Sequence, residues 1–153
     1  MTGTKFIMCE KEVLARTLYG EARGEYARLD GGLSALIGVA NVIINRAKRK
    51  SWFGKSVSEV CLKPYQFSCW NQADPNRPLL LNVSKDSDPL YATCLEVAEG
   101  ALSGKWPDLT KDSDHYYAVW MQRAPAWSLG AKPRVKLGQH LFFRLNPSTN
   151  QGA

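Results

Sequence analysis

The sequence predicts an α+β fold that is mainly helical and ends in a small antiparallel β element. Apolar residues recur every three or four positions in three segments of the first two thirds of the chain, which is the spacing of amphipathic helices. After Pro107, two short aromatic-rich runs replace this spacing and are typical of strands. The length of 153 residues and the apolar share of 44% fit one folded domain, which we expect to cover residues 1–153.

Two helices are predicted before residue 50. The first covers residues 10–20, where Val13, Leu14 and Leu18 share one face and two glutamates stand in the first turn, the helix end that favours negative charge. The second covers about residues 33–47 and is strongly apolar, so we expect it to be central. Its apolar positions are Leu33, Leu36, Ile37, Ala40, Ile44 and Ala47.

The middle of the chain predicts a short helix at residues 57–61 and then a long ordered loop over residues 62–89. Four prolines and several Asn and Asp residues interrupt this stretch, and these residue types favour turns. Loops of this length in a compact domain are usually functional. A third amphipathic helix starts at Leu90 and is ended by Gly104.

Two strands are predicted in the last third of the chain. They cover residues 115–120 and 140–145, which are rich in aromatic and other residues that favour strands. The connection between them contains Pro and Gly. We expect this antiparallel element to close over the helices.

The formal net charge of +6 predicts an anionic partner or environment. Residues 115–153 contain five Lys or Arg and no Asp or Glu. Nucleic acid, an anionic membrane surface and the bacterial cell wall all fit this charge. A second cationic cluster, residues 46–50, ends the second predicted helix, where positive charge complements the helix dipole.

The cysteine and histidine content gives little support for a metal site. The four cysteines contain no C-x-x-C pair and the chain has two histidines, so we expect reduced thiols, no metal and no cofactor. The longest nearly apolar run, residues 33–44, is too short to span a bilayer, so we expect no stable membrane insertion. The apolar stretch at the N-terminus is too short for a signal peptide, which predicts synthesis in a cytosol.

The segment Tyr19-Gly20-Glu21-Ala22-Arg23-Gly24-Glu25 is the candidate for acid–base chemistry. Its glycines allow close approach of a ligand to the backbone. A carboxyl group at the end of an apolar helix is partly desolvated, which raises its pKa toward that of a general acid working near neutral pH. The alternative interpretation is a pair of solvated glutamates on the surface.

Three later clusters combine aromatic rings with polar partners. They contain Gln66, Ser68 and Trp70 in the long loop, Tyr116 and Tyr117 in the first strand, and His140 in the second. Aromatic faces stack on sugar rings, while amide and hydroxyl groups bond to sugar hydroxyls. These residues are therefore candidates for carbohydrate binding, with core packing as the alternative for each aromatic ring.

The order of these clusters resembles that of the SleB-like cell wall hydrolases, a family that includes spore-cortex-lytic enzymes and bacteriophage endolysins. The resemblance covers about residues 13–145. Its matching segments are Leu14-Ala15-Arg16, Gly20-Glu21-Ala22-Arg23-Gly24-Glu25, residues 38–46, Gln66-Phe67-Ser68, Tyr116-Tyr117, Pro125-Ala126-Trp127 and Gly138-Gln139-His140-Leu141-Phe142.

This resemblance implies a lysozyme-like, transglycosylase-type fold that acts on the glycan of peptidoglycan. It implies Glu21 as the catalytic acid/base and a cleft lined by residues that match Gln66, Ser68, Tyr116 and Tyr117. We add Trp70 and His140, from the aromatic clusters described above, to the expected substrate-binding set. The family often has an Asn after the tyrosine pair, whereas this chain has Ala118, so no amide is available at that point.

The expected function is that of a peptidoglycan-degrading endolysin that cleaves the β-1,4 bond between N-acetylmuramic acid and N-acetylglucosamine. A single carried-over carboxylate, Glu21, favours a lytic transglycosylase that leaves 1,6-anhydro ends over a hydrolytic muramidase, which uses two carboxylates. Glu25 is the candidate second carboxylate, with an ion pair to Arg23 or Arg28 as its alternative role.

The other alternative is a non-catalytic module that binds cell wall or nucleic acid. We expect peptidoglycan, not nucleic acid, as the partner, and a monomer. The expected location is the cytoplasm of a host bacterium during synthesis and the cell wall during action, after a separate protein has permeabilised the membrane.

Overall fold

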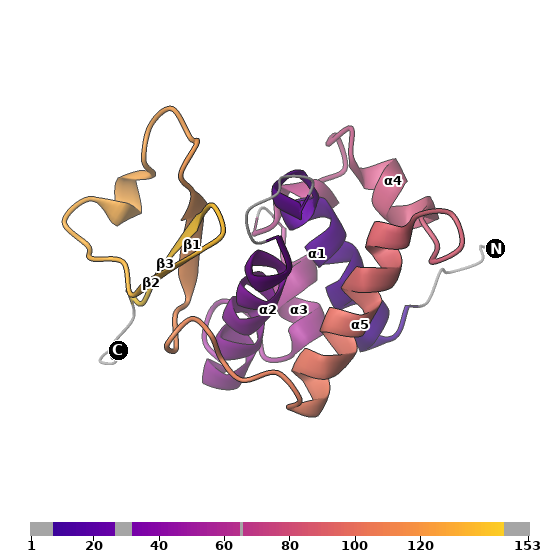
Figure 1. The fold of residues 1–153 in the computed structure, drawn as a ribbon, viewed down its shortest axis with the longest axis horizontal. Coiled ribbons are helices and arrows are strands. Elements are labelled where there is room, and N and C mark those ends of the chain that lie inside the picture. The colour runs from indigo at the N-terminus through magenta and orange to yellow at the C-terminus, as the bar shows by residue number, and fades with distance from the viewer. Residues whose placement is uncertain (1–7, 27–31, 65, 146–153) are drawn as a thin grey trace.

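The computed structural model of the protein describes residues 8–26, 32–64 and 66–145, with residues 22–26 described by their backbone alone. Helices come first and a three-stranded antiparallel sheet comes last, which confirms the predicted fold class (Figure 1). The helical elements are α1 (Glu10–Tyr26), α2 (Gly32–Arg49), α3 (Val57–Leu62), the 3-10 turn η1 (Ser68–Trp70), α4 (Arg77–Asn82), α5 (Pro89–Ser103) and the 3-10 turn η2 (Ala126–Ser128). The strands are β1 (His115–Ala118), β2 (Val135–Leu137) and β3 (His140–Phe143).

The hydrophobic core lies where α1, α2, α3 and α5 meet. Leu14 and Leu18 of α1 face Leu36 and Ile43 of α2 in one cluster, and all four side chains are fully buried. The sheet lies beside α2, on the side of the molecule opposite α5 (Figure 1). Within the described ranges, the helices are too short or too polar to cross a membrane.

The first helix continues past the predicted end at Gly20 and reaches Tyr26, so Glu21 lies inside α1. Glycine weakens a helix interior by about 1 kcal/mol relative to alanine. A Cβ on Gly20 would lie 2.8 Å from both Cβ and Sγ of Cys69 and 3.1 Å from a methyl of Leu80. The absent side chain therefore allows the 66–82 segment to pack directly on α1, and this packing offsets the local preference.

The predicted loop over residues 62–89 contains two elements that the sequence did not indicate, η1 and α4. Prolines were the reason for predicting a loop, but Pro78 and Pro89 stand in the first turns of α4 and α5, where no backbone N–H is required. Buried Arg16 of α1 anchors α4 because its Nη1 donates to the carbonyls of Leu80 at 2.6 Å and Val83 at 2.9 Å.

The sheet has the order β1-β3-β2, with Tyr116 and Val135 both opposite Phe142 of the central strand. The two predicted strands exist but are shorter than expected, and β2 lies in the stretch that was predicted to be a connection. β2 has three residues, with the exposed Lys136 in the middle, and this is too short a run to show the alternation of apolar and polar residues that is typical of a strand. Pairing with β3 therefore defines this edge strand.

Gly38 of α2 is a position where the sheet packs closely against a helix. A Cβ there would lie 2.6 Å from Cζ of Phe142 and 3.0 Å from a methyl of Leu137. We expect Gly38→Ala to lower the free energy of unfolding by about 1–3 kcal/mol because the fully buried Phe142 ring has to move. Urea unfolding measures this loss. Leu33→Ala, at an exposed position of the same helix, is the control, and equal losses would contradict the close approach.

Candidate active site

The carboxyl group of Glu21 lies between α1 and the sheet, where it meets a tyrosine from β1. The hydroxyl of Tyr116 donates to Oε1 of Glu21 at 2.9 Å. Burial raises the pKa of Glu21 above its ordinary value, although hydrogen bonds from Tyr116 and Cys69 and the charge of Arg46 act in the opposite direction. Asp74 adds a further upward contribution to this pKa. A carboxyl group with a raised pKa holds the proton that a general acid donates.

Both donors to Glu21 remain protonated at neutral pH. Burial and the charge of Glu21 hold the pKa of Tyr116 well above its usual value of 10. Burial is also the main reason that the pKa of the Cys69 thiol is raised. Cys69 reaches Glu21 because it packs in the space left by Gly20. The carboxyl group is therefore held by donors from two elements, η1 and β1.

Arg46, near the end of α2, is a buried cation close enough to influence this carboxyl group. Its Nε donates to the carbonyl of Asp114 at 2.8 Å, and its guanidinium lies 4.6 Å from the centre of the Phe53 ring. Burial lowers the pKa of Arg46, while the acidic groups around it raise it. The positive charge of Arg46 thus moderates the effect of burial on the pKa of Glu21.

Gln66, predicted to bind substrate, is bonded to the protein through both ends of its side-chain amide. Its Oε1 accepts from Nη1 of Arg46 at 3.0 Å, and its Nε2 donates to the carbonyls of Phe53 at 2.9 Å and Val60 at 2.7 Å. These contacts fix the guanidinium next to Glu21. Gln66 thus holds Arg46 in place, and its expected role in substrate binding stays a prediction.

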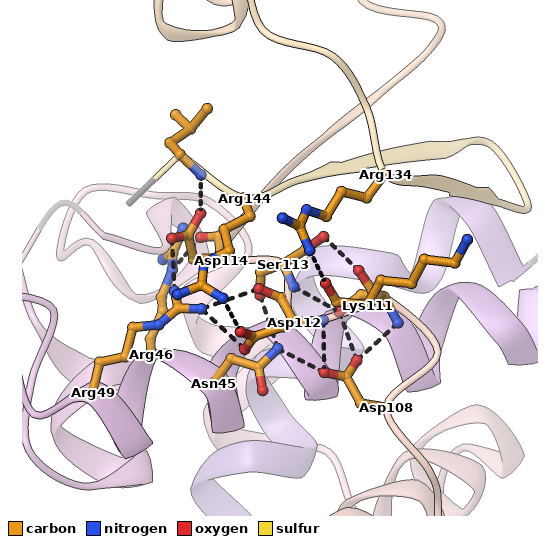
Figure 2. A network of polar contacts seen from close by, with 12 residues as sticks. Asn45, Arg46, Arg49, Asp108, Lys111, Asp112, Ser113, Asp114, Arg134 and Arg144 are labelled. Atoms are coloured by element: carbon orange, nitrogen blue, oxygen red, sulfur yellow. Dashed lines mark hydrogen bonds and ion pairs between the residues drawn. The ribbon is translucent and has the colours of Figure 1, made fainter. Parts of the chain in front are cut away.

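The end of α2 is tied to the segment before β1 by a polar network (Figure 2). Nδ2 of Asn45 donates to Oδ2 of Asp108 at 3.0 Å and to the carbonyl of Ser113 at 2.9 Å. Nη1 of Arg49 donates to Oδ2 of Asp114 at 2.6 Å. The network therefore sets the position of β1, and with it Tyr116, relative to α2.

Asp114 is the centre of this network, and its side chain is fully buried. Its Oδ1 accepts from the backbone N–H of Leu145 and from Nδ1 of His115, each at 2.9 Å. Burial alone would raise the pKa of Asp114, but these hydrogen bonds and the charges of His115 and Arg49 lower it to about 2. The group is ionised under all ordinary conditions.

The structure separates the predicted aromatic residues into two groups. Successive side chains of a strand point to opposite faces of a sheet. Tyr116 faces Glu21 and packs against the His140 ring, with 5.4 Å between ring centres, whereas Tyr117 stacks on Phe143 at 5.6 Å on the other face. Tyr117 is therefore not brought next to the carboxyl group.

His140 is only 3% exposed and lies behind Tyr116. Burial lowers the pKa of His140 to about 4, so the ring is neutral at pH 7. The ring packs against Tyr116, and its expected contact with a substrate stays a prediction. The other histidine, His115, is bonded to Asp114, and among the described residues no cluster of His, Cys, Asp and Glu could hold a metal ion.

The remaining predicted residues lie on η1, on either side of Cys69. Ser68 is exposed, while Trp70 is half-buried and donates from Nε1 to Oγ1 of Thr17 at 2.8 Å. Both are therefore within a few residues of the Cys69–Glu21 contact. The side chain of Glu25 lies outside the described residues, so its expected role stays a prediction.

Arg46, Cys69 and Asp114 belong to the site but were not among the predicted site residues. Arg46 follows Val42 and Ile43 by four and three positions, so a charge lies on the same face of the helix as buried apolar residues. That placement was the available signal, and it was interpreted as a helix-end charge. No pattern in the sequence indicates that Cys69 meets Glu21 or that Asp114 meets Arg49.

A family model described as cell wall hydrolase matches residues 32–143, a range that begins after Glu21. No curated protein matches the sequence significantly. Among solved structures, the fold is similar to the catalytic domain of the germination-specific lytic transglycosylase SleB from Bacillus anthracis, with 22% identity, a TM-score of 0.67, and coverage of 94% of this chain and 99% of that chain.

A second similar structure is the catalytic domain of the SleB protein from Bacillus cereus. It is 23% identical, with a TM-score of 0.63, and the match covers 94% of this chain and 98% of that one. At such low identity the likeness establishes the fold alone, and this fold is lysozyme-like, as the resemblance in the sequence implied.

Proposed function

Because the chain belongs to the cell wall hydrolase family, we propose that it is a peptidoglycan lytic transglycosylase with Glu21 as general acid and base. Its bond is the β-1,4 linkage between N-acetylmuramic acid and N-acetylglucosamine. The observation that carries this proposal is the carboxyl group of Glu21, whose pKa is raised by burial and which Tyr116 holds at 2.9 Å. The similar structure from Bacillus anthracis is that of a lytic transglycosylase, which supports the proposal.

The proposed reaction begins with the protonated form of Glu21. Its proton passes to the glycosidic oxygen as the bond to the anomeric carbon of the N-acetylmuramic acid breaks. The N-acetylglucosamine then leaves with a free 4-hydroxyl. The 6-hydroxyl of the muramic acid then attacks the anomeric carbon, and the carboxylate of Glu21 accepts the hydroxyl proton. No water is consumed, and the product carries a 1,6-anhydro ring.

The hydroxyl of Tyr116, the thiol of Cys69 and the charge of Arg46 support the second half of this cycle. They favour the ionised form of Glu21, which burial disfavours. The group can therefore exist in both protonation states during one turnover. This balance is what a single residue needs in order to act first as an acid and then as a base.

The alternative is a hydrolytic muramidase that uses a second carboxylate to activate water. Glu25 is the expected candidate, and Asp74 is a described carboxylate whose charge raises the pKa of Glu21.

We further propose that the enzyme serves as an endolysin. It would be made in a host cytoplasm and act on the cell wall after the membrane has been permeabilised. Its net charge of +6 favours binding to an anionic envelope.

The mass of the products separates the two reactions. We expect muropeptides released from purified peptidoglycan to carry 1,6-anhydro ends, which are lighter by one water than hydrolysed ends. Mass spectrometry of a complete digest measures the ratio of the two forms. Products that all carry the added water would replace the transglycosylase by a muramidase while leaving the role of Glu21 as an acid open.

The pH profile of the reaction tests the contact between Tyr116 and Glu21. Removing the hydroxyl in Tyr116→Phe takes away a donor to the carboxylate, so the pKa of Glu21 rises further and its acid form persists to higher pH. We expect the alkaline limb of kcat/KM to move to higher pH. Tyr117→Phe, on the opposite face of β1, is the matched control and leaves the limb in place. Equal profiles for all three proteins would contradict the contact.

A further inference from the structure

A cavity of about 300 Å³ opens beside η1, outside the residues assigned to the reaction. Its lining includes an aromatic ring, a proline, two side-chain amides and two cations, which belong to Trp70, Pro64, Asn71, Gln72, Lys63 and Arg77. None of the described lining residues is acidic. In a glycan-cleaving site, the neutral sugar backbone gives no reason for cations. An anionic group would be a suitable partner for the charge of this cavity.

One wall of the cavity, Trp70, is bonded to the helix that carries Glu21. The bond joins Trp70 to Thr17, which precedes Glu21 by four residues and so lies one turn away on the same face of α1. The neighbouring residue Cys69 contacts Gly20 and Glu21. The cavity and the carboxyl group are thus linked through η1, whose Trp70 lines the cavity and whose Cys69 contacts Glu21.

Arg77 is the cation best placed to bind an anion in this cavity. It is half-buried, and among the described residues none bonds to the side chains of Arg77, Asn71 or Gln72. The ammonium of Lys63 is already engaged, because it donates to the carbonyl of Trp52 and lies over the Trp52 ring. A guanidinium binds a carboxylate through two parallel hydrogen bonds, and side-chain amides pair with peptide groups.

We propose that this cavity binds the peptide stem carried by the muramic acid, with Arg77 holding a stem carboxylate and Asn71 and Gln72 bonding to its peptide groups. The proposal rests on the proposed function, since it assigns a second part of the same substrate to a second part of the same site. It makes Arg77 a specificity residue: the enzyme prefers glycan that bears peptide stems over glycan from which they have been removed.

The test compares two soluble glycan substrates, one with intact stems and one stripped by an amidase. We expect Arg77→Gln to raise KM about tenfold on the stem-bearing glycan, because one charge-assisted contact is lost, and to change KM less than about twofold on the stripped glycan. Lys85→Gln, which removes one charge from an exposed turn, is the control and leaves both values unchanged.

Two outcomes would overturn the proposal. One is an equal rise in KM on both substrates, which would mean that Arg77 stabilises the fold or acts at the scissile bond. The other is an unchanged KM on both substrates. If the unaltered enzyme cleaves neither glycan, the proposed function fails, and the cavity is then tested by binding alone. In that case, the isolated peptide stem is titrated into the protein and into Arg77→Gln with tryptophan fluorescence as the signal. Binding that depends on Arg77 retains the cavity as a peptide site, and its absence removes it.

Discussion

Glu21→Gln should reduce cell wall degradation by at least about 10²–10⁴-fold, the range for loss of a general acid–base group. Glutamine keeps the shape of the side chain and an oxygen that accepts from Tyr116, but it has no proton to donate. Loss of turbidity of permeabilised bacterial cells measures the effect. Glu96→Gln, at an exposed position of α5, is the matched control and should retain full activity. More than about a tenth of the activity in Glu21→Gln would remove Glu21 from its proposed role.

The same substitution should not destabilise the protein at neutral pH. Because the pKa of Glu21 is raised in the folded state, the folded protein holds this proton to higher pH than the unfolded chain does. Stability is therefore lost as pH rises above 4.5, the ordinary value for this group. Glu21→Gln lacks this loss, so its melting temperature should equal that of the unaltered protein at low pH and exceed it once the pH has risen above 4.5. A melting temperature lower than that of the unaltered protein at pH 7 would contradict the burial of an ionisable carboxyl.

Asp114→Asn should lower the free energy of unfolding by about 3–5 kcal/mol, the cost of breaking a buried ion pair by removing one partner. Its amide cannot accept from Arg49, His115 and the N–H of Leu145 together. Asp112→Asn is a close control because Asp112 also pairs with Arg49 but its side chain is 50% exposed. We expect a loss of at most about 1 kcal/mol there. If urea unfolding shows similar losses of unfolding free energy for the two variants, burial does not determine how much these ion pairs stabilise the protein.

Acid titration gives an independent measure of the same group. The pKa of Asp114 is about 2 in the folded protein, below its ordinary value of 3.8, so its contribution is fully present above pH 4 and is lost as pH falls toward 2. The contribution is about 2 kcal/mol. We expect the stability of Asp114→Asn to depend less on pH over this interval than that of the unaltered protein. Parallel curves for the two proteins would contradict the lowered pKa.

Much of the fold could be predicted because helical periodicity is a local property of the chain. The apolar stripe of α2, the start of α1 with its acidic first turn and the end of α5 at Gly104 all follow from patterns within a few turns. The errors are equally instructive. Gly20 and Pro78 were interpreted by their local preference, but Gly20 is held inside α1 by Cys69, and Pro78 stands where a helix begins.

The candidate site shows the same division. The sequence indicated Glu21, Gln66 and the tyrosine pair as a group, and the structure joins Glu21 to Tyr116 and ties Gln66 to Arg46. It places Tyr117 on the other face of the sheet, although the two tyrosines are neighbours in the chain. Neighbouring residues of a strand point to opposite faces of the sheet. Which of two adjacent aromatic residues faces the site therefore depends on how the strand is paired, and the sequence does not show this.

The sequence by itself determined the helical framework, the position of the small sheet and the candidate acid, because these depend on periodicity and on residue types close together in the chain. Only the tertiary structure decided what surrounds that acid. The hydroxyl of Tyr116, the thiol of Cys69 and the charge of Arg46 come from segments far apart in the sequence. The proton affinity of Glu21 depends on burial and on these distant partners, and therefore on a geometry that exists only once α1, η1, α2 and β1 have packed together.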